Sequence, residues 1–326
     1  MARKSIAIIG VGKIAEDQHL PVIDRSPDFE LAAVVSQRGV QVGGVPTFAT
    51  PAELYAAMPG LDAVAICTPP GVRHAIVCEA LDAGVDVLME KPPTTTISEL
   101  DDLVARARKA DRVLFATWHS QFNKAVDKVR KDLSRNGVRR VRIDWRENVR
   151  KWHPGQEWVW APGGFGVFDP GINALSIFTR IMPQPVFVTD ATLSFPANRQ
   201  TPIAAEIRFR AAGTGSEPEL TAGFDWREED GEVWRFEIET GDGRRLALSG
   251  GGRRLEIDGE LALEHESEEY EGIYARFAKL LKKGRSDVDA APLKLVADAF
   301  LVGGRRTVDA FDWQPVSLVG EPAQEN

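Results

Sequence analysis

The sequence predicts an α/β protein: an N-terminal doubly wound parallel sheet, followed by an α+β domain with a large, open, mostly antiparallel sheet. Up to about residue 120, apolar runs alternate with helix-forming segments such as 76–83 and 100–110, the order of repeated β-α-β units. The runs are residues 6–9, 31–35, 63–67, 85–89 and 113–116. They are almost continuously apolar, as burial on both faces of a parallel sheet requires.

From residue 138 the apolar period changes to two, which predicts the second sheet. Val141, Ile143 and Trp145 share one face of a strand whose other face is charged. The same alternation recurs over residues 220–226 and 234–238, so one face of this sheet is expected to be covered. We therefore divide the chain into residues 1–120 and 121–326. A helix over residues 292–311 is a candidate to pack back on the first domain.

Composition limits the class of ligand. A formal charge of -8 over 326 residues argues against nucleic acid or an anionic membrane as a partner, and leaves small solutes. Two cysteines, too far apart for a redox pair, indicate a reducing cytoplasm. The apolar stretch 6–12 is too short for a signal or a membrane span, so the N-terminus is expected to begin the fold. The five histidines show no metal-ligand spacing, and no metal is expected. An open sheet face rich in Trp and Phe suggests a homo-oligomer.

A glycine-rich turn after the first apolar run predicts a dinucleotide site. Gly10, Gly12 and Ala15 form G-x-G-x-x-A, with Lys13 and Ile14 inside the turn, at the start of a possible helix. The first glycine permits the tight turn, the second lets the backbone approach a pyrophosphate, and the small third residue lets helix and strand pack. The helix N-terminus favours the phosphate charge. The alternative is a glycine turn with no ligand.

The end of the second apolar run predicts which dinucleotide is used. An NAD site usually offers a carboxylate here to the adenosine ribose, whereas this chain has Ser36, Gln37 and Arg38. A hydroxyl and a guanidinium suit a 2′-phosphate, and no carboxylate is present to repel it. The expected dinucleotide is NADP. The alternatives are that NAD is accepted as well, or that Arg38 is simply a solvated loop residue.

Lys91 is the first candidate catalytic residue. It lies in Glu90-Lys91-Pro92-Pro93, directly after the apolar run 85–89. Ligands of open parallel sheets bind outside the carboxyl ends of the strands, so Lys91 is expected to face a crevice. Pro92 restricts the conformation of Lys91, and their peptide bond is one that can be cis. The alternative is a charged loop.

Several motifs together resemble the Gfo/Idh/MocA oxidoreductase family. They are residues 10–15, Thr68-Pro69-Pro70 with His74, Glu90-Lys91-Pro92, Gly163-Gly164, and Asp169 with Gly171 and Asn173. The resemblance implies a Rossmann domain, an open-sheet substrate domain, and NAD(P) between them with its nicotinamide near Lys91. It adds Thr68, Pro69, His74 and Glu90 to the expected cofactor-binding residues, although His74 could instead cap its helix.

Within the family, three segments look most like the bacterial 1-dehydrogenases of L-arabinose and D-galactose. The segments are residues 117–119, 150–155 and 166–173. The implied function is oxidation of the anomeric hydroxyl of an aldose to an aldonolactone by hydride transfer to NAD(P)+. The alternatives are a non-catalytic sugar- or dinucleotide-sensing regulator and a cyclitol or other polyol dehydrogenase.

Asp169 and Asn173 complete the expected catalytic set. Asp169 precedes Pro170, which is also what a helix start looks like. A helix beginning there puts Asn173 one turn further on, so that both side chains can face one pocket. The family commonly has histidine at this position, whereas an amide cannot shuttle a proton. An anomeric hydroxyl is more acidic than an ordinary secondary alcohol, so Asn173 favours an aldose.

Four more residues are expected to bind the substrate. Glu147 continues the apolar face of its strand, and burial of a carboxylate there is costly unless the group has a function. The alternative is that the strand has already ended and Glu147 is solvated. His119 follows the last strand of the first sheet, and His153 lies in a tryptophan-rich loop. Aromatic faces suit the C–H faces of a sugar, and of these tryptophans we expect only Trp152 to line the site.

Overall fold

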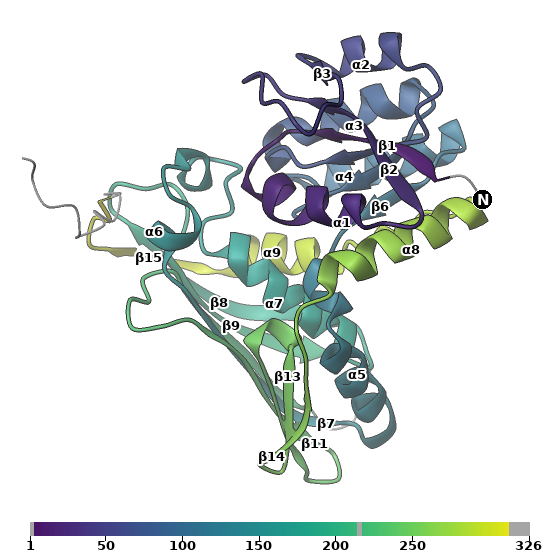
Figure 1. Cartoon of the computed structure of the whole chain (residues 1–326). Helices are drawn as coiled ribbons and strands as arrows, with labels where there is room; N and C mark the ends of the chain where they lie inside the picture. Colours follow the sequence, from purple (N-terminus) through teal and green to yellow (C-terminus); the bar gives the residue numbers. More distant parts are fainter. Residues whose placement is uncertain (1–2, 214–216, 313–326) are drawn as a thin grey trace, which may run out of the picture.

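The computed structural model describes residues 3–213 and 217–312, which contain two large sheets (Figure 1). The first sheet has six parallel strands in the order β3-β2-β1-β4-β5-β6. They are β1 (Lys4–Ile9), β2 (Phe29–Val35), β3 (Thr47–Phe48), β4 (Ala63–Ile66), β5 (Asp86–Met89) and β6 (Leu114–Ala116). Each predicted apolar run forms one of its five longer strands, and the predicted parallel sheet is confirmed.

Helices cover both faces of this sheet, which makes it doubly wound as predicted. α2 (Pro51–Ala57), α3 (Pro70–Asp82) and α4 (Ile97–Ala110) pack on the face that carries Ile9, Ile66 and Met89. The π-helix η1 (Ala15–His19), α1 (Leu20–Asp24) and α8 (Glu269–Lys283) pack on the face that carries Ile8 and Leu88. Both faces are therefore buried, which explains the continuous apolar runs.

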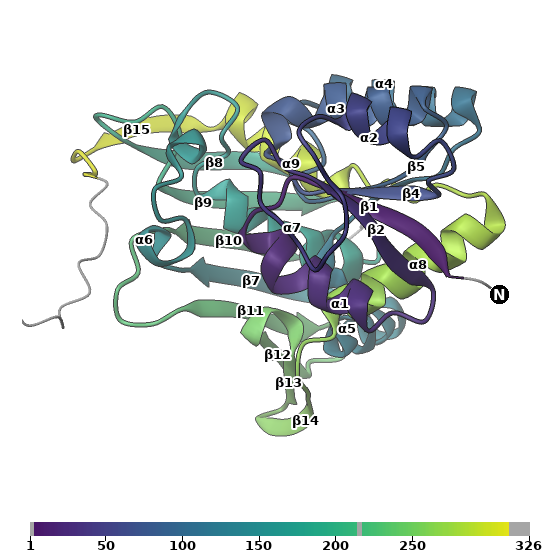
Figure 2. The same cartoon turned by 45° about the horizontal axis from the view of Figure 1, so that its top comes forward.

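Helix α8 comes from the distant C-terminal part of the chain but lies against the first sheet (Figures 1 and 2). Its apolar positions recur every three or four residues, and Phe277 is fully buried. The Phe277 ring stacks on Phe29 of β2 at a centroid distance of 5.7 Å and on Phe115 of β6 at 6.1 Å. Helix α8 therefore ties the two parts of the chain together.

The second sheet has nine strands in the order β14-β13-β12-β11-β7-β10-β9-β8-β15. It is mostly antiparallel, as predicted, but β7 pairs with β10 and β8 with β15 in parallel. Its strands are β7 (Val138–Arg146), β8 (Val186–Pro196), β9 (Ala204–Ala211), β10 (Glu219–Asp225), β11 (Val233–Thr240), β12 (Arg245–Ser249), β13 (Arg254–Ile257), β14 (Glu260–Glu264) and β15 (Gly304–Val308).

One face of the second sheet is covered by helices, and the other carries charged side chains. The long helices of this part are α5 (Lys124–Asn136), α7 (Phe168–Ile181) and α9 (Ala291–Val302). The shorter ones are η2 (His119–Phe122), α6 (Val149–Trp152), η3 (Glu157–Trp160) and η4 (Gly250–Gly252). Trp145, Phe224 and Phe236 are buried on the covered face, whereas Arg140, Arg142 and Arg146 are exposed. The expected Trp- and Phe-rich open face is therefore wrong, and self-association stays a prediction.

The predicted helix over residues 292–311 is also wrong in its second half. Helix α9 ends at Val302, and Gly303 and Gly304 lead into β15, which pairs with β8. Residues 304–308 form a strand because their backbone pairs with β8. The local sequence pattern gives no information about this distant partner. Helix α9 contacts mainly β8 and α7.

In the described part of the chain, no helix is long and apolar enough to cross a bilayer.

Candidate active site

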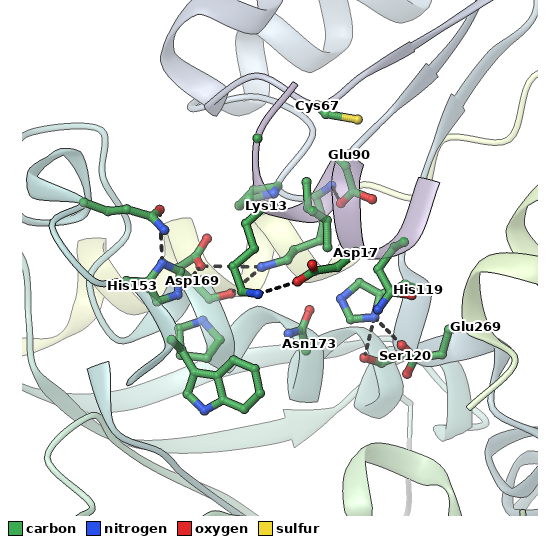
Figure 3. Close-up of a pocket in the computed structure, with 18 of the residues that line it drawn as sticks. Lys13, Asp17, Cys67, Glu90, His119, Ser120, His153, Asp169, Asn173 and Glu269 are labelled. Carbon is green, nitrogen blue, oxygen red and sulfur yellow. Dashed lines mark hydrogen bonds and ion pairs between the residues drawn. The ribbon is translucent and has the colours of Figure 1, made fainter. Parts of the chain in front are cut away.

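A cavity of about 890 Å³ lies between the carboxyl ends of the first sheet's strands and the covered face of the second sheet. The first sheet contributes the residues after β1, β4 and β5, and the second part contributes side chains from β7, α7, α8 and the loops after β7. Figure 3 shows Lys13 and Glu90 on the first side, with Asp169 and Asn173 opposite. The cavity is therefore where parallel-sheet topology predicts a ligand.

The predicted dinucleotide turn forms the edge of the cavity at the end of β1. Gly10 has a φ of 92°, and a Cβ at this position would lie 2.8 Å from Cγ2 of Thr68, so glycine is required twice over. A Cβ on Gly12 would meet nothing within 4 Å, so the backbone stays open towards the cavity. Lys13 and Ile14 line the cavity, and Lys13 pairs with Asp17.

Of the three residues predicted to select the dinucleotide, only Arg38 lines the cavity. Its guanidinium donates to the carbonyl oxygen of Val11 at 2.9 Å, so it lies beside the glycine turn. Ser36 is buried and its hydroxyl accepts from the backbone N–H of Val40 at 3.2 Å, whereas Gln37 is exposed. No acidic side chain is present at the end of β2, between residues 35 and 40.

The Lys91 turn is held by buried groups. The Lys91–Pro92 peptide bond is cis, and the buried Arg73 guanidinium donates to the carbonyl oxygens of Glu90, Pro92 and Thr68. Thr68, Pro69 and Glu90, which the family resemblance suggested, also line the cavity. The backbone of this turn is therefore fixed before any ligand binds.

The Lys91 side chain crosses the cavity to Asp169. Its Nζ donates to the backbone carbonyl of Asp169 at 3.1 Å and lies 3.5 Å from Oδ2 of the same residue. Nε2 of His153 lies 3.2 Å from this Oδ2, so one carboxylate oxygen faces two nitrogen groups. Burial lowers the pKa of His153, which favours its neutral form. Figure 3 shows His153 beside Asp169.

Helix α7 begins one residue before Asp169, and its N-cap is Val167, so Asp169 is not a helix cap. Asn173 follows one turn later and lines the cavity. The preceding loop is tightly packed: a Cβ on Gly164 would lie 1.9 Å from the carbonyl oxygen of Trp158, and one on Gly166 would lie 2.4 Å from that of Pro202. This packing fixes the direction in which α7 enters the cavity wall.

Glu147 lies just after β7 and its side chain is 6 % exposed. Oε1 accepts from Nε1 of Trp226 at 3.3 Å, and Oε2 accepts from Nε1 of Trp234 at 3.1 Å. Burial raises the pKa of Glu147 to about 7, against the opposing effect of the two indole donors. A carboxyl group that titrates near neutrality therefore faces the cavity.

The other predicted substrate residues also line the cavity. Nδ1 of His119 lies 2.8 Å from Oε2 of Glu269. Burial alone lowers the pKa of His119, but the Glu269 carboxylate outweighs burial and the net shift is upward. Trp152 is 36 % exposed at the rim, with Nε1 3.1 Å from Oε1 of Glu232.

His74, another predicted cofactor residue, is also directed away from the cavity. Its Nε2 lies 2.9 Å from Oδ2 of Asp102 on α4, and His74 does not line the cavity. A contact between His74 and the dinucleotide therefore finds no support in the structure. Ligand atoms of His74, Cys78 and Asp102 lie within 4.8 Å of one another, which the sequence spacing did not reveal. Nε of Arg106 donates to the same Asp102 oxygen at 2.6 Å, so this carboxylate already has a cationic partner.

Sequence reasoning missed several cavity residues. Trp145, Trp158 and Trp234 line the site in addition to Trp152. All three belong to segments whose apolar pattern or composition was visible in the sequence. No sequence motif marked Arg73 or Glu269. Each side chain reaches the cavity because its helix, α3 or α8, packs there in the folded protein.

Comparison with known proteins gives the family. Residues 4–117 match the model of the Gfo/Idh/MocA oxidoreductase family with an NAD-binding Rossmann fold. A galactose 1-dehydrogenase of Pseudomonas fluorescens is 43 % identical over 94 % of this chain and 98 % of its own length. The chain therefore belongs to this oxidoreductase family.

Solved structures agree over almost the whole chain. A D-galactose-1-dehydrogenase from Rhizobium etli superposes with a TM-score of 0.91 at 47 % identity, covering 96 % of this chain and 99 % of its own. A 3-ketoreductase from Actinomadura kijaniata, solved with NADP and TDP-benzene, gives a TM-score of 0.80 at 18 % identity over 94 % of this chain and 100 % of its own. The second similarity concerns the fold alone.

The raised pKa of Glu147 predicts a pH-dependent stability. Between the ordinary pKa of about 4.5 and the folded value of about 7, the folded protein holds a proton that the unfolded chain has lost. Stability should therefore fall as the pH rises through this window. Relative to Glu147→Gln, the wild type should lose on the order of 2 to 3 kcal/mol between pH 4.5 and pH 8.

Urea unfolding of both proteins at several pH values measures this difference. Glu260→Gln, which removes an exposed carboxylate, is the matched control and should follow the wild type. Parallel curves for Glu147→Gln and the wild type would show that Glu147 titrates normally.

Proposed function

We propose that this protein is an NAD(P)-dependent aldose 1-dehydrogenase that oxidises the anomeric hydroxyl of D-galactose, L-arabinose or both to the aldonolactone. The observation that carries the proposal is the contact between Lys91 and Asp169 across a cavity rimmed by a dinucleotide turn. The whole-length similarity to two galactose 1-dehydrogenases supports the choice of substrate.

The residues at the glycine turn fit a dinucleotide. Gly10 permits the tight turn, Gly12 leaves the backbone open to a pyrophosphate, and η1 follows the turn. Arg38 supplies a cation beside this turn, where the adenosine ribose of a bound dinucleotide would lie, and we infer a preference for NADP with NAD also accepted. A dinucleotide held by these residues would supply the hydride acceptor for oxidation at C1 of the sugar.

The chain's own residues then handle the proton of the anomeric hydroxyl. Lys91 donates hydrogen bonds through Nζ to the anomeric oxygen and stabilises the negative charge that develops there. Asp169 accepts the proton at its carboxylate, which Lys91 and His153 hold in place. Asn173 is an amide and holds a hydroxyl without taking the proton.

The remaining polar side chains bind the ring hydroxyls. Glu147 and His119 lie on the walls, and His153 lies beside Asp169. Trp152 and Trp234 offer aromatic faces to the C–H side of a pyranose. D-galactose and L-arabinose share most ring configurations and differ by a hydroxymethyl group, so both fit one pattern of acceptors.

Absorbance of the reduced dinucleotide tests the proposal directly. The purified protein is mixed with NADP+ or NAD+ and with D-galactose, L-arabinose, D-glucose, D-xylose or myo-inositol. We expect reduction with D-galactose or L-arabinose and little with myo-inositol. Absence of reduction with every aldose would reject the proposed function, and reduction with myo-inositol alone would make the protein a cyclitol dehydrogenase.

Replacement of Lys91 by alanine should remove charge stabilisation while leaving the dinucleotide turn intact. We expect Lys91→Ala to lower kcat by about 10²- to 10⁴-fold and to change the Kd for NADP+ by less than about threefold. Steady-state kinetics and fluorescence titration of NADPH measure the two quantities. Lys109→Ala, at an exposed position on α4, is the control. Near-normal turnover of Lys91→Ala would reject the role of Lys91.

Replacement of Arg38 by alanine should act on one dinucleotide only. Since a charged hydrogen bond to phosphate is lost, the KM for NADP+ should rise by about tenfold or more, while the KM for NAD+ changes by less than about twofold. Initial rates with each dinucleotide at saturating sugar measure this difference. An equal effect on both, or a strong preference of the wild type for NAD+, would contradict the assignment of Arg38.

A further inference from the structure

A buried polar cluster lies beside the Lys91 turn and is centred on Glu90. Oε1 of Glu90 accepts from the hydroxyl of Tyr270 at 2.8 Å and lies 3.0 Å from Nε2 of His19. Nδ1 of His19 lies 2.8 Å from the hydroxyl of Tyr274. All four side chains are at most 4 % exposed. They come from three separate places: the dinucleotide-binding η1, the end of β5, and α8.

The cluster contains a carboxylate that burial alone would protonate. Burial raises the pKa of Glu90, but the hydrogen bond and charge of His19, with the Tyr270 hydroxyl, lower it well below its ordinary range. Burial lowers the pKa of His19, but the surrounding Cys67, Tyr274 and Glu90 side chains raise it above its ordinary value. Glu90 is therefore an anion that depends on the groups from η1 and α8.

The ionised Glu90 side chain acts on the backbone of the next residue. Its second oxygen, Oε2, accepts from the backbone N–H of Lys91 at 2.9 Å. The backbone carbonyl of Glu90 in turn accepts from Arg73. The orientation of the Glu90 carboxylate therefore helps to set the direction in which the Lys91 side chain leaves the turn towards Asp169.

We propose that Tyr270 and His19 are positioning residues for Lys91: they hold the Glu90 carboxylate, and Glu90 holds the Lys91 backbone in the orientation that faces the substrate. Neither residue is needed to touch the sugar. Tyr270 belongs to the second part of the chain and His19 to the dinucleotide-binding helix. The cluster thus makes the geometry of Lys91 depend on how both are packed.

The neighbouring residues place the same helical turn at the cavity wall. The Tyr270 ring stacks on His119 at a centroid distance of 5.7 Å and an interplanar angle of 19°. Glu269, one residue earlier, pairs with His119 and accepts from Asn123 Nδ2 at 2.6 Å. Figure 3 shows Glu269 beside His119, with Glu90 nearer the strand ends. The first turn of α8 is therefore fixed at the positions from which Tyr270 reaches Glu90.

A double-mutant cycle tests whether Tyr270 acts through Lys91. This arm rests on the proposed function, because it needs turnover. Tyr270→Phe should lower kcat by about tenfold and leave the KM for the sugar within about twofold, because transition-state positioning is lost but binding is kept. In the Lys91→Ala background the same change should lower kcat by less than about twofold, since the residue through which it acts is absent.

Tyr55→Phe is the matched control, because it also removes one buried tyrosine hydroxyl. In the described part of the chain this hydroxyl has no hydrogen-bond partner, and it lies on α2, away from the cavity. It should leave kcat within about twofold of the wild type. Circular dichroism and thermal unfolding of each variant measure whether it is folded. If Tyr270→Phe does not fold, His19→Ala and His19→Gln enter the same cycle, and Gln should restore part of the loss because its amide can donate to Glu90.

Amide hydrogen exchange gives a readout that needs no substrate. In a peptide that begins within β5 and ends at Thr94 the two prolines carry no amide, so the Lys91 N–H is one of the few amides after the strand whose exchange mass spectrometry detects. Tyr270→Phe should accelerate exchange at this amide, and Tyr55→Phe should not.

The outcomes separate the two proposals. Faster exchange together with a kcat loss that depends on Lys91 supports the positioning role. Equal kcat losses in both backgrounds, or unchanged exchange, would overturn it and leave Tyr270 as a packing residue. If the wild type reduces no dinucleotide with any aldose, the proposed function fails, and the exchange arm still decides whether Tyr270 and Glu90 hold the Lys91 backbone.

Discussion

The fixation of the Lys91 turn is the constraint on which the rest of the site depends. Arg73 binds the carbonyl oxygens on both sides of Lys91, and the Glu90 carboxylate binds its N–H. Burial of an unpaired guanidinium or carboxylate costs free energy. Here both groups form hydrogen bonds with the polar backbone of a sharp turn, which offsets part of that cost. The backbone of Lys91 is thereby held in one conformation, which restricts the orientations of its long, flexible side chain and favours the reactive one.

The same principle applies on the opposite side of the cavity. Asp169 lies in the first turn of α7, whose approach is fixed by a glycine loop with no room for side chains. Glu147 is enclosed by two indoles that donate to it, so its environment is apolar and yet provides hydrogen bonds. These two carboxylates of one cavity thus have different surroundings. Asp169 faces a lysine and a histidine, whereas the loss of hydration raises the pKa of Glu147.

The local parts of this architecture were predictable from the sequence. The β-α-β order, the glycine turn and Lys91 at a strand end all rest on short-range pattern, and the structure has the corresponding sheet and turn. The predictions failed where a distant partner decides. Residues 304–308 form a strand because β8 is alongside, and His74 turns to Asp102 because α3 packs on α4. The outer face of the second sheet is charged because its aromatic side chains pack under helices.

Short-range features of the chain therefore specify the class of fold, the position of a dinucleotide turn and the residue types that can move a proton and stabilise charge. These features depend on periodicity, backbone permissiveness and side-chain chemistry, all of which are local. The contact of Tyr270 with Glu90, which lies 180 residues away in the chain, and the contact of Asp169 with Lys91 arise only from packing in the folded protein. Such contacts depend on how helices and sheets pack, and no short segment carries that information.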